Sequence, residues 1–239
     1  MNTFTKHLSK VFTAAALCGA AISANALTLT FDEPGIKHGT IINDQYSDLG
    51  VSIYADNLYQ RPWNDRAVAF DTTRKRSRDP DLQLNPVDFP DVGNVLIIQE
   101  NNWCNREKCF RPDDEGRRPA GSLFFEFDKA IDSLSFSYLD IETPETSTVK
   151  LYDGTNTLVK SVDFGDLSGA TFGDNNYATV GAIALAGLGI QKVEFALGGS
   201  GALDDITVSQ VPVPASLGIL LMGLLGLQFA RRRMLKKVS

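Results

Sequence analysis

The chain has 239 residues, of which 29 are acidic and 23 are basic. All of the acidic residues but only 16 of the basic ones lie between residues 27 and 210, which gives this stretch a net charge of −13. Such acidity disfavours nucleic acid and anionic lipid as partners, and it suits a solvated surface protein or one that binds cations.

The first 26 residues have the pattern of a secretory signal peptide. Lys6 and Lys10 precede an apolar run over residues 11–22, and the Ala-Asn-Ala sequence of residues 24–26 fits the small-x-small cleavage rule. We therefore expect residues 1–26 to direct export across an inner membrane, with Leu27 as the mature N-terminus.

Residues 27–210 are of a suitable length for one domain with a substantial core. Short alternating or apolar runs between turn residues predict strands at 27–31, 51–55, 95–99, 122–127, 131–138, 148–152, 157–164, 179–185, 190–196 and 202–208. Asp153 and Gly154 between two such runs predict a β-hairpin. We expect an all-β domain, a β-sandwich of jelly-roll or Greek-key type. A β-solenoid is the alternative, disfavoured by the lack of an internal repeat.

Residues 56–120 interrupt the strand pattern and are expected to form a loop-rich insertion. This stretch contains both tryptophans, Trp63 and Trp103, and 11 of the 16 basic residues of the domain. One interpretation is a set of loops in which exposed tryptophans stack on sugar rings and arginines bind acidic polysaccharide. The other is a solvated insertion whose tryptophans cover the edge of the core.

Cys104 and Cys109 are the two cysteines that follow the signal segment, and four residues separate them. In an oxidising compartment this spacing predicts a small disulfide loop. A zinc site is the alternative, but His38 is the only histidine of the domain, and two cysteines do not complete a tetrahedral shell.

Acidic residues lie at both ends of the domain, Asp32 and Glu33 near its start and Asp204 and Asp205 near its end. This arrangement resembles carbohydrate-binding-module-like domains that end in a strand with two aspartates. Only one of Asp204 and Asp205 can face the interior of a strand, and a buried carboxylate needs a partner. Calcium, which takes about 6–8 oxygen ligands, is a candidate structural cofactor, and capping of backbone N–H groups is the alternative.

Signals for catalysis are weak. His38 has no GxSxG elbow, HExxH pair or cysteine–histidine pair to accompany it, so we expect a protein that is not an enzyme. Glycoside hydrolysis by paired carboxylates stays open, because the sequence does not reveal the separation that this chemistry needs.

The last 29 residues contain a proline motif, an apolar run and a basic cluster. The motif consists of Val211, Pro212, Val213 and Pro214. The run over residues 215–230 has no charge and reaches about 24 Å as a helix, short but sufficient for a tilted or thinned membrane crossing. The basic residues that follow are Arg231, Arg232, Arg233, Lys236 and Lys237. The positive-inside rule predicts that this cluster is cytoplasmic and that the acidic domain lies outside.

This C-terminal pattern resembles the PEP-CTERM sorting signal of Gram-negative bacteria, with Val213 in place of the glutamate of the name. The resemblance implies a membrane-anchored precursor, an exosortase-like processing enzyme as partner, and delivery to the cell surface or the extracellular polysaccharide matrix. An ordinary tail anchor is the alternative.

Three hypotheses follow. The first is an exported, exosortase-sorted surface or matrix protein without catalytic activity. The second is a carbohydrate-binding surface protein that uses Trp63 and Trp103, and the third is a polysaccharide-active hydrolase.

Overall fold

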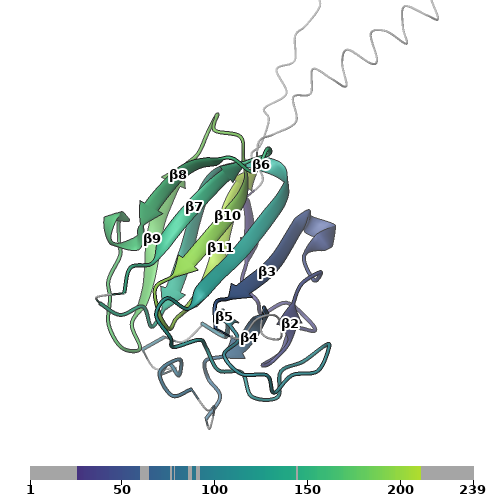
Figure 1. Ribbon diagram of the computed structural model, residues 1–239, viewed down its shortest axis with the longest axis vertical. Helices are drawn as coiled ribbons and strands as arrows, with labels where there is room; N and C mark the ends of the chain where they lie inside the picture. The colour runs from purple at the N-terminus through teal and green to yellow at the C-terminus, as the bar shows by residue number, and fades with distance from the viewer. Residues whose placement is uncertain are drawn as a thin grey trace, which may run out of the picture. The chain divides into compact units, whose positions relative to one another are not determined.

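The computed structural model of the protein describes residues 26–59, 65–75, 77, 79–85, 88–89, 92–143 and 145–210 (Figure 1). In chain order the elements are β1 (Ala26–Leu29), β2 (Ile41–Ile42), η1 (Ser47–Leu49), β3 (Val51–Asn57), β4 (Ala67–Asp71), β5 (Asn94–Ile98), β6 (Gly121–Leu139), β7 (Thr148–Asp153), β8 (Leu158–Asp163), η2 (Phe164–Asp166), β9 (Tyr177–Ala184), β10 (Ile190–Leu197) and β11 (Ala202–Gln210). The η elements are single 3₁₀ turns, and every strand pairing is antiparallel.

The long strand β6 belongs to two layers. Its first part, residues 121–127, pairs with β3 on one side and β10 on the other. Its second part, residues 133–139, pairs with β9 and β11. Between these parts lie the register shifts that let a strand bend from one sheet into another.

Layer 1 runs in the order β3, β6, β10, β7, β8, and layer 2 runs β9, β6, β11, β5, β4, β2 (Figure 1). In layer 2, β11 pairs with β5 through Ala202 and Leu203, and with β1 through residues 206–209. Because β6 is shared, the hydrogen-bonded network is continuous although the chain forms two packed layers.

The main core lies between the layers. Phe125 and Phe195 of layer 1 contact each other with ring centroids 5.5 Å apart, and Phe195 lies 4.8 Å from Phe136 of layer 2. All three side chains are buried. Each of them lies on the side of its strand that faces the core. The prediction of an all-β, sandwich-like domain is thus confirmed.

A second apolar cluster lies on the outer side of layer 2, over β2, β4 and β5. Strands β4 and β5 are buried on both faces, because their alternate residues divide between the two clusters. The outer cluster consists of Ile41, Val68, Phe70, Leu82, Leu84, Val95, Ile97, Cys109, Leu139 and Ala202. Leu82, Leu84 and Cys109 come from loops of the stretch 56–120, which therefore packs over layer 2.

Two details of the sequence prediction were wrong. The two strands expected at 122–127 and 131–138 are one continuous strand, which runs through the polar residues between them. The stretch 56–120 contributes β4 to layer 2 in addition to the expected strand β5. The strands β2 and β4 were missed because both are short, and β4, buried on both faces, lacks the alternation that reveals a strand.

The predicted signal segment 1–26, except Ala26, and the predicted sorting segment 211–239 lie outside the described residues. Among the residues that are described, no helix is long and apolar enough to span a membrane.

Candidate functional site

The outer face of layer 1 carries aromatic residues. In β3 and the first part of β6, odd-numbered residues face the core and even-numbered residues face outward. Tyr54 of β3 lies directly opposite Phe124 of β6, and their rings stack with centroids 4.8 Å apart and planes 16° from parallel. Tyr152 of β7 lies opposite Lys192 of β10 on the same face. We call Tyr54, Phe124, Tyr152 and Lys192 the aromatic face.

Lys192 lies among the three rings. Its Nζ is 4.9 Å from the Phe124 centroid, 5.6 Å from that of Tyr152 and 5.8 Å from that of Tyr54, distances at which an ammonium is attracted to a ring. Nζ also lies 3.5 Å from Oε1 of Glu126, which accepts a hydrogen bond from the Tyr54 hydroxyl. These contacts hold a cation, a carboxylate and aromatic surface within one patch.

Glu194 fixes the middle of this face. It accepts hydrogen bonds from the Lys150 ammonium, the Tyr152 hydroxyl and the Ser122 hydroxyl. Burial alone would raise the pKa of Glu194, but these three donors outweigh burial and hold the pKa below its ordinary value. The carboxylate is therefore ionised at neutral pH and keeps the Tyr152 ring in one orientation.

Sequence reasoning missed the aromatic face, although a signal was present. The buried residues Ile53, Leu123 and Phe125 occupy the odd positions of their strands, so Tyr54 and Phe124 at even positions face solvent. A single exposed aromatic residue is common, whereas a contiguous patch of them points to a binding site. What the sequence could not supply was the register that places the two rings side by side.

The predicted disulfide between Cys104 and Cys109 is confirmed, with a sulfur–sulfur distance of 2.07 Å. Cys109 is buried in the outer cluster of layer 2, and Trp103 is 53% exposed. The Arg111 guanidinium lies 3.9 Å from the Trp103 ring centroid. One of the two predicted sugar-stacking tryptophans is therefore accessible but already contacts a cation, and Trp63 lies outside the described residues.

The acidic residues at the two ends of the domain bind protein donors. Asp32 Oδ1 accepts hydrogen bonds from both the backbone and the side-chain nitrogen of Asn94. Glu33 Oε2 accepts one from the Tyr46 hydroxyl. Among the described residues, no group of three or more His, Cys, Asp or Glu side chains is arranged to hold a metal ion.

Asp204 is buried and Asp205 is half-buried, so one of the two faces inward as predicted. Burial, together with the charges of Asp205 and Asp32, raises the pKa of Asp204 to about 8. Asp204 Oδ1 accepts a hydrogen bond from the Asp205 backbone N–H, and the Tyr177 hydroxyl contacts both carboxylates. Asp32, Asp204 and Asp205 are thus close enough to influence one another, and calcium binding there stays a prediction.

His38 has a structural role. Its Nδ1 accepts a hydrogen bond from the Asp71 backbone N–H at 3.1 Å, and its ring packs on Phe70. Burial, together with the positive charge of nearby Arg74, lowers the pKa of His38 to about 4. The imidazole is therefore neutral and its lone pair is engaged.

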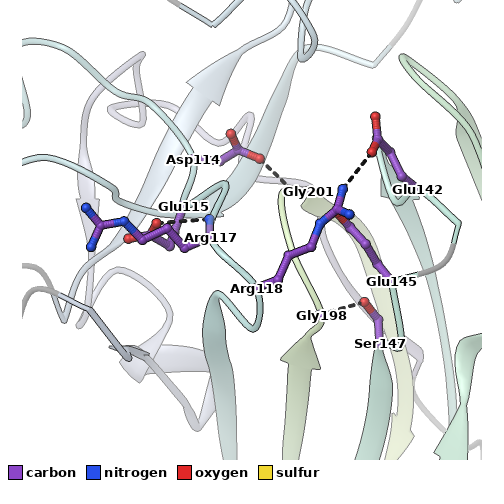
Figure 2. Close-up of polar contacts among 9 residues, drawn as sticks. All are labelled: Asp114, Glu115, Arg117, Arg118, Glu142, Glu145, Ser147, Gly198 and Gly201. Atoms are coloured by element: carbon purple, nitrogen blue, oxygen red, sulfur yellow. Dashed lines mark hydrogen bonds and ion pairs between the residues drawn. The ribbon is translucent and has the colours of Figure 1, made fainter.

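Two cavities lie at opposite ends of β7. The larger, about 400 Å³, is lined by Glu145, Ser147 and η2 among others. Near this cavity, Arg118 forms ion pairs with Glu142 and Glu145, with nitrogen–oxygen distances of 3.0 and 2.8 Å, and Figure 2 shows the three side chains. The Glu145 side chain is only 1% exposed. The smaller cavity, about 250 Å³, adjoins the aromatic face and includes Glu126 and Lys192 in its lining.

No protein-family model matches the chain, and no curated protein matches it. Among solved structures, the K2 cleaved adhesin domain of Lys-gingipain is 13% identical, with a TM-score of 0.39 over 78% of this chain and all of that chain. The Stig cyclase Fisc from Fischerella sp. TAU is 14% identical, with a TM-score of 0.41 over 79% of this chain and all of that one.

The xylan-hydrolase structure of Clostridium thermocellum Xyn10B, with CBM22-1 and GH10 modules, is 9% identical, with a TM-score of 0.33 over 73% of this chain and 28% of that chain. Likenesses at these TM-scores do not carry function across.

Proposed function

We propose that this protein is an exported, non-catalytic surface protein that binds a glycan on the aromatic face of layer 1. The observation that carries the proposal is the pair Tyr54 and Phe124, whose rings stack face to face on the outward side of the sheet beside Lys192 and Glu126. In layer 2, loops of the stretch 56–120 pack over the outer side of β4 and β5. In this proposal the domain is a jelly-roll of the carbohydrate-binding-module type.

The chemistry of the face matches that of a sugar ring. A pyranose has apolar C–H faces that pack on flat rings and hydroxyl groups at its edges that both donate and accept hydrogen bonds. Tyr54 and Phe124 offer the apolar surface, Lys192 donates, and Glu126 accepts. Hydrogen bonds that an ammonium donates or a carboxylate accepts are of the stronger, charge-assisted kind.

The experiment is a glycan-array screen of the full-length protein in detergent, followed by calorimetry on the glycans that bind. Tyr54→Ala and Phe124→Ala should each weaken binding about ten-fold, the loss expected for one stacked ring. Trp103→Ala is the matched control, because its ring is exposed but lies next to the disulfide loop, away from the aromatic face. Binding that survives both face variants would overturn this assignment, and binding lost only in Trp103→Ala would move the site to that loop. Thermal melting checks that each variant is folded.

The route of the protein to the surface rests on the two terminal segments. The signal pattern of residues 1–26 and the motif, apolar run and arginines of residues 211–239 support export followed by sorting through an exosortase-like enzyme. Deleting residues 211–239 should release the domain as a soluble secreted protein. A deletion variant that stays at the surface unchanged would contradict the sorting step without bearing on glycan binding.

A further inference from the structure

The smaller cavity continues the aromatic face at one end. It is lined by Glu126, Phe127, Asp153, Gly154, Asn156, Gln191 and Lys192. Glu126 and Lys192 belong both to this cavity and to the cluster around Tyr54 and Phe124. The cavity and the aromatic face are therefore adjacent, and a ligand bound to the rings can extend into the cavity.

The hairpin between β7 and β8 forms the end wall of this cavity. Asp153 Oδ1 accepts three hydrogen bonds, from the backbone and hydroxyl of Thr155 and from the Thr157 backbone. Asn156 has a positive φ of 63°, which the tight turn requires. Gly154 lies directly against the Gln191 side chain of β10. This hydrogen-bonded turn closes one end of the cavity, so a bound glycan chain could not continue past it.

The polar groups of the cavity are those that bind hydroxyl groups. Glu126, whose side chain is 47% exposed, offers a carboxylate, and Lys192 offers an ammonium. The amides of Asn156 and Gln191 can each donate and accept. A volume of about 250 Å³ lies below the range of roughly 300–1,000 Å³ typical of drug-sized ligands, so the cavity has room for a single ring.

We infer that this cavity binds the terminal residue of a glycan chain whose next residues lie on the aromatic face. The protein then recognises chain ends and not the interior of a polymer. This inference rests on the proposed function, and it adds a specificity that the aromatic face alone would not give, because an open sheet face accepts a chain running in either direction.

The test compares polymers with their own fragments. Dextran, a mixed-linkage β-glucan and a galactan serve as probes, each intact and after partial hydrolysis to oligomers of about ten residues, with binding measured by calorimetry. Recognition of chain ends predicts one protein bound per chain end, so binding sites per gram rise in proportion to the ends that hydrolysis creates. Gln191→Ala and Asn156→Ala should each weaken oligomer binding about ten-fold, as expected for one lost hydrogen-bonding group.

Several outcomes separate this inference from the proposed function. Many proteins bound along each intact chain, with wild-type affinity in Gln191→Ala and Asn156→Ala, would overturn end recognition and leave glycan binding intact. Wild-type binding by Tyr54→Ala and Phe124→Ala would overturn the proposed function itself, as would failure of every polysaccharide on both this panel and the array. Trp103→Ala again serves as the folded control.

Discussion

Replacing Phe195 with alanine tests the contact between the two layers. The ring of Phe195 is fully buried and lies 5.5 Å from Phe125 in its own layer and 4.8 Å from Phe136 in the other. Truncating such a phenylalanine removes its buried apolar surface and leaves a cavity, which together cost about 3–5 kcal/mol. Single domains are stable by only about 5–15 kcal/mol, so the variant should lose a large share of its stability.

Urea denaturation monitored by circular dichroism measures this loss. At a slope of about 2 kcal/mol per molar urea, a loss of about 4 kcal/mol lowers the midpoint by about 2 M. Phe110→Ala is the matched control, because the Phe110 side chain is 62% exposed and its removal should change stability by about 0.5 kcal/mol or less. If Phe195→Ala and Phe110→Ala were equally stable, the Phe195 ring could not lie between two packed layers, and the described architecture would be wrong.

Three further predictions concern the charges and loops of the domain. Burial raises the pKa of Asp140 to about 7, so the free energy of unfolding should fall as the pH rises from about 5 to 7. Asp140→Asn should flatten this slope by at most about 1.4 kcal/mol per pH unit. Equal slopes for the variant and the wild type in urea titrations would contradict this prediction. Gly39→Ala should destabilise the protein by about 1–3 kcal/mol or more. Gly39 has a φ of 85°, and a Cβ there would lie 2.1 Å from the Cys109 carbonyl oxygen. An unchanged melting temperature would refute this prediction. Replacing Cys104 and Cys109 together by serine should cost about 2 kcal/mol, the loop entropy of a six-residue ring, and reduction of the wild type should give the same midpoint shift.

Local residue patterns were sufficient to predict most strands, one hairpin and the disulfide. Alternating side chains located most of the strands to within one or two residues, since one face of each strand is buried and the other is solvated. Asp153 and Gly154 predicted the hairpin between β7 and β8, because their backbone preferences are local. The disulfide followed from the short spacing of Cys104 and Cys109, which limits how far apart they can lie.

The residues that form the candidate site are brought together by the pairing of distant strands. Tyr54, Phe124, Tyr152 and Lys192 come from four strands, and they meet because the pairing register of those strands aligns them. A shift of one residue in any pairing would turn a side chain to the other face, and no local sequence signal sets that register. The burial of β4 and β5 on both faces was likewise hidden, since a strand covered on both sides has no alternation to detect. Strand identity is local because it depends on neighbours in the chain, whereas the candidate site depends on pairings between residues as far apart as Tyr54 and Lys192.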